Sequence, residues 1–296
     1  MKKIGIDLGG SHVSIGVVDK NGKIIKQYEK DFTVKEKQNI MEVAENYITE
    51  NINLLKEELD IKSVGLAMPG TIKDGIVVKS VNLGIEDYNL GEKLLKSTGI
   101  EFKIKNDAKC AALGEYEYEI KDATKKILFL TLGTGIGGAF IYDGKLLEGG
   151  SFEGYEFGHM TIKENGILCR CGKKGCFEKY GSILCFKEKI QNRLNLSADI
   201  SGPELRKEIA KQEEKVKDIQ EEYIKDLGLG LSNLINIFEP DIIIIGGGFA
   251  RYDYMLLDKL KNSLLTSGLL FNKRENLDLR VAKLGNDAGV VGASCL

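Results

Sequence analysis

The chain lacks the features that mark membrane, exported and nucleic-acid-binding proteins. No apolar run approaches the length of about 20 residues that a membrane-spanning helix needs, and the N-terminal apolar stretch ends at Asp7, too early for a signal peptide. The net charge is only −2, so no excess of positive charge argues for nucleic acid or an anionic membrane. Tryptophan is absent, and histidine occurs only twice. We therefore expect a cytoplasmic protein that binds neither nucleic acid nor membrane.

The composition that remains is ordinary for a soluble globular protein. Hydrophobic residues make up 43% and charged residues 29% of 296 residues. This length gives a prior of about two domains, with enough chain for a buried core.

A short cysteine-rich loop is the most specific motif in the chain. Cys169, Cys171 and Cys176 lie within eight residues, and His159 stands just upstream. Three thiolates and one imidazole are the donor set of a closed, structural zinc site. Free thiols and a disulfide staple are the alternatives, and a disulfide framework does not suit a chain without an export signal. Glu156 and Glu178 flank the loop, so a metal that fixes the loop also fixes these carboxylates.

A strand, a glycine-rich turn, a second strand and an Asx-Gly turn occur in that order twice. Two copies of this plan suggest two related domains that face each other across a cleft. Alternatively, the glycines of each turn serve only the hairpin. That reading weakens because both turns carry a small hydroxyl residue, Ser11 or Thr134, beside glycines that let backbone N–H groups approach a phosphate. The turns are residues 7–11 and 21–22 in the first copy, and residues 133–138 and 143–144 in the second.

The second turn matches the dinucleotide-binding fingerprint in its letters. Gly133, Gly135 and Gly138 give G-x-G-x-x-G, but that fingerprint requires a helix after the last glycine. Residues 139–142 favour a strand instead, so the sequence argues against an NAD enzyme. The P-loop pattern G-x-x-x-x-G-K-[ST] does not occur either.

A third glycine cluster follows a fully apolar strand. Residues 241–245 read Asp-Ile-Ile-Ile-Ile, and Gly246, Gly247 and Gly248 come next. Upstream, apolar residues at helical spacing between Tyr223 and Phe238 predict a helix that ends before Pro240. A helix, a buried strand and a glycine turn form an α/β crossover whose strand end opens at a ligand crevice.

Taken together, these motifs resemble the ROK family of sugar kinases and sugar-responsive repressors. Residues 7–11 and 132–138 resemble its two phosphate loops, and residues 156–159 match its E-x-G-H element. Residues 169–176 match its C-x-C-G-x-x-G-C signature, and Gly246–Gly248 lie where the family holds adenosine. The resemblance extends over essentially the whole chain.

The resemblance implies an α/β fold of the two-domain, actin-like (ribonuclease H-like) ATPase class, with a cleft between the domains. The expected small N-terminal domain is residues 1–117 plus 284–296, because in the family a C-terminal helix packs back onto it. Residues 286–294 are small and favour such a helix. Residues 118–283 would form the larger domain, which carries the zinc loop.

The resemblance also assigns roles to individual residues. Asp107 would be the general base that accepts the proton of the sugar hydroxyl, and Asn106 would position that hydroxyl. Without the family, capping of the helix that starts at Ala108 would be the preferred explanation of this Asn-Asp pair. Asp7 would place Mg²⁺ near the phosphates, with turn capping as its alternative. The remaining roles are sugar binding by Asn82, Glu156, His159 and Glu178; ATP binding by Gly9, Gly10, Ser11, Gly133, Thr134, Gly135, Gly137, Gly246, Gly247 and Gly248; and zinc binding by His159, Cys169, Cys171 and Cys176.

The expected activity is ATP-dependent phosphorylation of a hexose, with glucose favoured. The alternatives are a kinase for fructose, allose, N-acetylglucosamine or N-acetylmannosamine, and a non-catalytic sugar-sensing regulator. The family's regulators carry a DNA-binding domain before the first phosphate loop, whereas here Asp7 comes almost at once. Where the family often reads Asn-Leu-Pro-Gly-Trp, this chain has Asn82-Leu83-Gly84-Ile85-Glu86, which leaves the sugar open. ATP, Mg²⁺ and structural Zn²⁺ are the expected cofactors, and a homodimer or homotetramer is the expected assembly.

Overall fold

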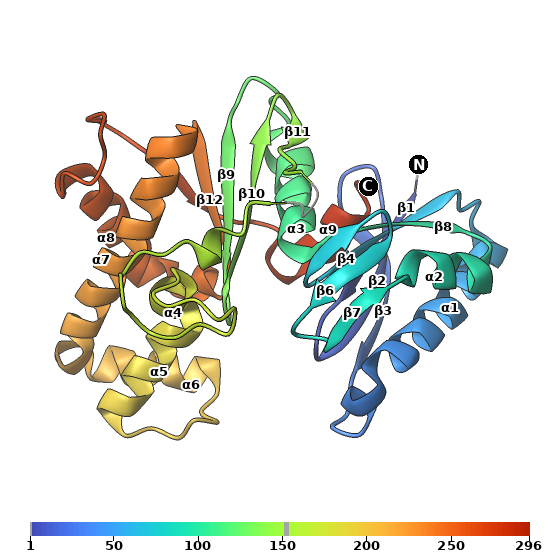
Figure 1. Ribbon diagram of the computed structural model, residues 1–296, viewed down its shortest axis with the longest axis horizontal. Coiled ribbons are helices and arrows are strands. Elements are labelled where there is room, and N and C mark those ends of the chain that lie inside the picture. Colours follow the sequence, from blue (N-terminus) through green and yellow to red (C-terminus); the bar gives the residue numbers. More distant parts are fainter. Residues whose placement is uncertain (1, 151–153) are drawn as a thin grey trace. The chain divides into compact units, whose positions relative to one another are not determined.

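The computed structural model describes residues 2–150 and 154–296, and the chain divides into two compact units (Figure 1). The first unit takes the described residues of Met1–Thr124, Ile141–Tyr155 and Lys283–Leu296, and the second takes Lys125–Phe140 and Glu156–Ala282. The chain therefore returns to the first unit twice after leaving it. The domain limits given above remain a prediction.

The first unit is built on a mixed sheet with the strand order β3-β2-β1-β4-β8. Strands β1, β2 and β3 are antiparallel neighbours, whereas β1, β4 and β8 are parallel. The two strands predicted on either side of the first glycine turn are β1 and β2, and Ile6 and Ile15 face each other in the register and are fully buried. The strands are β1 (Lys3–Leu8), β2 (His12–Val18), β3 (Ile24–Asp31), β4 (Ser63–Met68) and β8 (Glu101–Asn106), with a second small sheet of β5 (Thr71–Lys73), β6 (Ile76–Ser80) and β7 (Ile85–Tyr88).

The C-terminal helix α9 packs directly onto the backbone of this sheet. A Cβ atom on Gly5 would lie 1.9 Å from the carbonyl oxygen of Val290, and one on Gly65 would lie 1.7 Å from that of Ala293. Only glycine therefore fits at these two strand positions. The predicted small-residue helix at the C-terminus is confirmed. The helical segments of this unit are η1 (Glu36–Asn39), α1 (Ile40–Glu58), α2 (Leu90–Thr98), α3 (Asp107–Glu115), the π-helical turn η2 (Tyr116–Ile120), η5 (Gly285–Asp287) and α9 (Ala288–Ala293).

The second sheet has the strand order β11-β10-β9-β12-β13. Counted within each sheet, this order is the same as in the first unit, so the predicted structural repeat is confirmed. Strand β12 contains the isoleucine run and lies parallel to β9 on one side and β13 on the other, with Ile242 to Ile245 buried. The strands are β9 (Ile127–Leu132), β10 (Ile136–Tyr142), β11 (Lys145–Leu146), β12 (Ile242–Gly247) and β13 (Asp278–Val281).

Helix α7 is the long helix of the second unit. It begins at Glu213, ten residues before the predicted start at Tyr223, because Val216 and Ile219 continue the buried apolar stripe into the charged segment. Ser201 and Glu204 form a capping box at the start of α6. The helical segments are η3 (Phe157–His159), α4 (Glu178–Gly181), α5 (Ile183–Leu194), α6 (Gly202–Lys211), α7 (Glu213–Phe238), η4 (Gly248–Arg251) and α8 (Asp253–Thr266).

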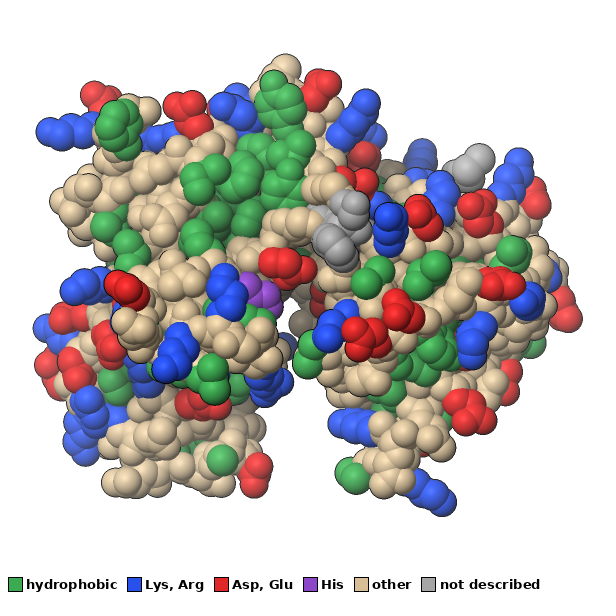
Figure 2. Space-filling model, viewed as in Figure 1, with side chains coloured by type: hydrophobic (Ala, Val, Ile, Leu, Met, Phe, Trp, Pro, Cys, Tyr) green, Lys and Arg blue, Asp and Glu red, His purple; other side chains and the backbone are tan. Residues whose placement is uncertain are grey.

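The surface shows acidic and basic side chains mixed over the visible face (Figure 2), in keeping with the near-zero net charge. In residues 2–150 and 154–296, no helix is both long enough and apolar enough to span a bilayer.

Candidate functional site

The four predicted zinc ligands come together in the second unit. The ligand atoms of His159, Cys169, Cys171 and Cys176 all lie within 4.8 Å of one another. The Cys171 and Cys176 sulfur atoms are 3.6 Å apart, and the Cys169 sulfur is 3.7 Å from Nδ1 of His159. In a tetrahedron with Zn–S bonds of about 2.3 Å, neighbouring ligand atoms lie about 3.8 Å apart. The cluster therefore fits a tetrahedral metal ion, which Nδ1 of His159 faces.

The backbone of the cysteine loop is shaped by two glycines in the left-handed region. Gly172 has φ of 89° and Gly175 has φ of 75°, conformations that L side chains rarely adopt. A Cβ atom on Gly175 would also lie 1.7 Å from the carbonyl oxygen of Lys163. The backbone N–H of Cys169 donates to the carbonyl of Lys173 (2.8 Å), which closes the loop between the cysteines. The two glycines thus allow the loop to turn tightly enough for the three thiols to converge.

The thiols of the cluster do not ionise equally. Burial raises the pKa of Cys169 to about 12, and its hydrogen bond to the Glu178 carboxylate adds to the rise. Burial also opposes ionisation of Cys171, but hydrogen bonds from the Lys173 backbone and from Cys169 and Cys176 outweigh it and lower the pKa. A divalent cation is the species that would hold all of these sulfur atoms as thiolates.

The E-x-G-H element lies against the start of β10. A Cβ atom on Gly158 would lie 2.2 Å from the carbonyl oxygen of Ile136, so the glycine is required by packing. The Glu156 side chain is exposed just before η3, and the backbone N–H of His159 donates to the Glu156 carbonyl (3.0 Å). Since Nδ1 of His159 faces the cysteines, Nε2 is the ring nitrogen available to a ligand.

Glu178 is the first residue of α4 and touches the cysteine cluster. Its Oε1 accepts a hydrogen bond from the Cys169 thiol (3.0 Å) and lies 3.9 Å from Nδ1 of His159. The Glu178 carboxylate is mostly sheltered from solvent. The structure thus brings the predicted sugar-binding residues His159 and Glu178 together.

The second glycine turn lies between β9 and β10. The backbone N–H of Gly133 donates to the carbonyl of Gly135, and the carbonyl of Gly133 accepts from the N–H of Leu184 (both 3.0 Å). Thr134 is exposed at the tip. The turn leads into strand β10 and not into a helix, so the argument against a dinucleotide fold is confirmed.

The glycines of this turn differ in what a side chain at their positions would contact. A Cβ atom on Gly133 would meet no atom within 4 Å. One on Gly138 would lie 2.7 Å from the Phe129 carbonyl oxygen and the Phe157 ring, which is a packing requirement. Gly137 lies within β10 and is partly exposed.

The third glycine turn ends β12 beside the end of β9. Gly247 has φ of 71°, and a Cβ atom there would lie 2.7 Å from Oγ1 of Thr131. A Cβ on Gly246 would approach the Phe129 ring, and one on Gly248 would approach Ile183, both at 3.2 Å. Because β9 and β12 are parallel, their carboxyl ends form one edge, which is where ligands bind in open α/β sheets.

Asp7 and Asp107 lie at the corresponding edge of the first sheet. Asp7 pairs with Ala67 near the end of β1, and Asn106 ends β8 opposite Met68. Burial raises the pKa of Asp7 to about 6, with the Asp107 charge adding to the rise and His12 opposing it. His12, for which the sequence suggested no role, is therefore close to a candidate metal ligand.

Asp107 is the first residue of α3. Its Oδ1 accepts from the backbone N–H of Ala108 (2.9 Å), and burial raises the pKa of Asp107 despite this bond and one to Asn106. Asn106 is the N-cap, with Oδ1 accepting from the N–H groups of Ala108 (3.0 Å) and Lys109 (3.3 Å). Helix capping, the alternative reading of the pair, is thus true of Asn106, and the Asp107 carboxylate also accepts from an N–H of the first turn. Nδ2 of Asn106 donates to the carbonyl of Gly70, a partner that the sequence did not suggest.

The first glycine turn lies next to Asn82. Gly9 donates its backbone N–H to the carbonyl of His12 (2.9 Å), which closes the turn. A Cβ atom on Gly10 would meet only the carbonyl oxygen of Asn82 (3.6 Å), so packing does not require glycine there. Ser11 and the Asn82 side chain are exposed.

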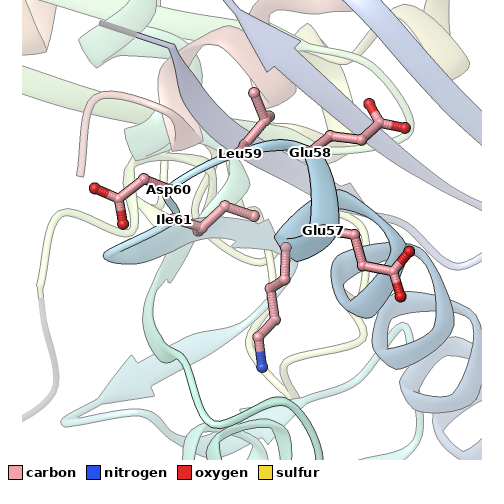
Figure 3. Close-up of a pocket in the computed structure, with 6 residues that line it drawn as sticks. Glu57, Glu58, Leu59, Asp60 and Ile61 are labelled. Carbon is pink, nitrogen blue, oxygen red and sulfur yellow. The ribbon is translucent and has the colours of Figure 1, made fainter.

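A shallow hollow elsewhere in the first unit contains none of these residues. It measures about 420 Å³ at the end of α1, lined by Lys56, Glu57, Glu58, Leu59, Asp60 and Ile61. Figure 3 shows the carboxylates of Glu57, Glu58 and Asp60 pointing apart from one another, without a common focus. We assign this hollow no ligand.

Comparison with known proteins identifies one family. The family model described as "ROK family" matches residues 3–296. A glucokinase of Halalkalibacterium halodurans is 30% identical, covering 99% of this chain and 94% of that protein. A glucokinase of Thermotoga maritima is also 30% identical, covering 100% and 97%. A glucokinase structure from Streptomyces griseus, in complex with glucose and AMPPNP, is 28% identical with a TM-score of 0.83, covering 100% of this chain and 98% of that one.

Proposed function

This chain belongs to the ROK family, has its two-domain actin-like ATPase fold, and on that premise we propose that it transfers the γ-phosphoryl group of ATP to a hexose hydroxyl, with glucose as the first candidate. The observation that carries the proposal is the similarity to glucokinases along the whole chain. The two phosphate-loop turns, the E-x-G-H element and the carboxylate at Asp107 supply the chemical groups that this reaction requires.

Asp107 would act as the general base. It accepts the proton of the attacking hydroxyl while that oxygen forms a bond to the γ-phosphorus and the bond from this phosphorus to the bridging oxygen of ADP breaks. A carboxylate whose pKa is raised by burial is a stronger base than one in water, provided that it remains ionised at neutral pH. Asn106, whose side chain is hydrogen-bonded to Gly70 and to Asp107, would position the hydroxyl beside the Asp107 carboxylate.

Glu156, Nε2 of His159 and Glu178 would bind other sugar hydroxyls, together with Asn82. The cysteine cluster with Nδ1 of His159 would hold zinc, which supplies rigidity and no open coordination position for catalysis. This arrangement gives His159 two separate tasks, one for each ring nitrogen.

ATP would lie along the glycine turns. A Cβ atom on Gly133 would meet no protein atom within 4 Å, and one on Gly10 would meet only the Asn82 carbonyl oxygen, so a phosphate can approach the backbone of both turns. The exposed Ser11 and Thr134 hydroxyls can bond to the same phosphates. Asp7 would help to hold Mg²⁺, and the turn of Gly246, Gly247 and Gly248 would hold the adenosine. A homo-oligomeric, cytoplasmic enzyme completes the proposal.

A coupled assay of ADP release across a hexose panel tests the proposal. The panel contains glucose, fructose, mannose, allose, N-acetylglucosamine and N-acetylmannosamine, and we expect the highest kcat/KM with glucose. Preference for another sugar would change the substrate within the class. Sugar binding without turnover on any member would instead identify a sugar-sensing regulator.

A further inference from the structure

The Glu178 carboxylate lies between the cysteine cluster and the second glycine turn. Its Oε1 accepts a hydrogen bond from the Cys169 thiol (3.0 Å). Its other oxygen, Oε2, occupies the space that a side chain on Gly135 would fill, because a Cβ atom there would lie 2.7 Å from it. One carboxylate therefore contacts two motifs that are more than thirty residues apart in the chain.

Gly133 and Gly135 differ in whether packing against the rest of the protein requires glycine. Neither has φ in the left-handed region, so the backbone conformation requires glycine at neither position. A Cβ atom on Gly133 would meet no atom within 4 Å, whereas one on Gly135 would collide with Glu178. The absence of a side chain at Gly135 thus leaves the space that the Glu178 carboxylate occupies.

We infer that Gly135 is a positioning residue for Glu178. Their close approach couples the second glycine turn mechanically to the predicted sugar-binding residues His159 and Glu178. The inference rests on the proposed function for the identity of the two ligands, but not for the contact itself. The backbone of the turn is also bonded to α5, the helix that follows α4, since the carbonyl of Gly133 accepts a hydrogen bond from the N–H of Leu184 (3.0 Å). A shift of the turn on binding a phosphate would therefore be passed to the carboxylate that the proposed function assigns to the sugar.

The contact at Gly135 is suited to a clean substitution. The atom that a new methyl group would meet is the end of a flexible glutamate side chain, so rotation of Glu178 relieves the collision at little cost in stability. Gly135→Ala should therefore fold normally and displace Glu178 from its place. Gly133→Ala adds the same methyl group to the same turn without touching the carboxylate, and is the matched control.

Glucose binding measured by calorimetry without nucleotide gives the first readout. We expect Gly135→Ala to weaken it by about tenfold or more, the effect of losing one charge-assisted hydrogen bond, and Gly133→Ala to leave it unchanged. Thermal unfolding of both variants should stay close to wild type. Wild-type glucose affinity in folded Gly135→Ala protein would overturn the inference.

A second readout does not depend on sugar. Because Glu178 lies beside Cys169, which is a thiolate when zinc is bound, displacing the carboxylate removes a repulsion between like charges. We therefore expect zinc-loaded Gly135→Ala protein to release metal to a chelator more slowly than Gly133→Ala protein does. In a Glu178→Ala background the two glycine variants should release it at equal rates. If no hexose binds to wild-type protein, the proposed function fails and this comparison still decides the inference. Equal release rates with Glu178 present would then reject it.

Discussion

The side-chain amide nitrogen of Asn106 donates a hydrogen bond to the carbonyl oxygen of Gly70 (3.1 Å). The amide oxygen of the same side chain accepts from the first backbone N–H groups of α3. An asparagine amide has two N–H donors, and the Asn106 side chain is also hydrogen-bonded to the Asp107 carboxylate, which fixes the predicted base relative to the amide. Gly70 has φ of 120°, and a Cβ atom there would lie 2.4 Å from the carbonyl oxygen of Lys79, so the partner of Asn106 must be a glycine.

Asn106→Asp tests this relationship. Aspartate caps a helix about as well as asparagine, so the protein should fold. It cannot donate to the Gly70 carbonyl, and it adds a negative charge beside Asp107. We expect kcat to fall by at least about tenfold, since a hydrogen bond is replaced by repulsion between oxygen atoms. Asn89→Asp is the control because Asn89 caps α2 in the same unit, and it should retain full turnover. Equal turnover of both variants would remove this positioning role.

Asp107→Asn tests the general base. Asparagine keeps the shape of the side chain and can still accept from the Ala108 N–H, but it cannot take up the hydroxyl proton. We expect turnover to drop by about 10²- to 10⁴-fold while sugar affinity stays within a small factor of wild type. Steady-state kinetics and calorimetry measure the two effects. Near-wild-type turnover in the folded variant would exclude Asp107 as the base.

Metal analysis tests the cysteine cluster. We expect about one equivalent of zinc per chain in protein purified without chelators. Cys176→Ser, which alters a fully buried member of the cluster, should lose the metal and lower the unfolding temperature. Cys185→Ser, outside the cluster, should keep it. Less than about half an equivalent in wild-type protein would count against the site.

Because burial raises the pKa of Asp7, we expect the free energy of unfolding to depend on pH. The pKa of this carboxyl is raised from 3.8 to about 6 in the folded state, so the folded protein binds more protons than the unfolded chain between these values. Its contribution to stability is therefore full below pH 3.8 and is lost as the pH rises through 6. The shift corresponds to at most about 3 kcal/mol. Asp7→Asn should raise the unfolding temperature at pH 7.5 and change it little at pH 4. The opposite pattern would contradict the raised pKa.

Gly292→Ala tests the packing of α9 on α3. A Cβ atom there would lie 1.7 Å from the backbone carbonyl oxygen of Cys110, which cannot move aside as a side chain can. We expect the free energy of unfolding to fall by more than about 3 kcal/mol, measured by urea denaturation. Gly202→Ala, where the new Cβ would meet only the Arg206 guanidinium at 3.6 Å, should be nearly neutral. A fully stable Gly292→Ala protein would refute this account.

Much of the architecture could be predicted from the sequence because its signals are local. Alternation of apolar residues specified β1 and β2, and the isoleucine run specified the buried strand β12. The strand after Gly138 excluded the dinucleotide fold, since the next four residues favour extended backbone. The motifs that resembled the ROK family led to the correct family and fold. The roles of individual site residues stay predictions.

What the sequence did not reveal depends on atoms that are distant along the chain. It suggested a phosphate-binding role for Gly135, and only the packed structure showed that the Glu178 carboxylate fills the space beside it. It assigned nothing to His12, which lies close enough to Asp7 to lower its pKa. Spacing and residue type determine which groups a loop can offer, because they act through the local backbone. The contact of a carboxylate with a distant glycine and the shift of a pKa by burial both require separate elements to pack closely. That packing exists only in the tertiary structure.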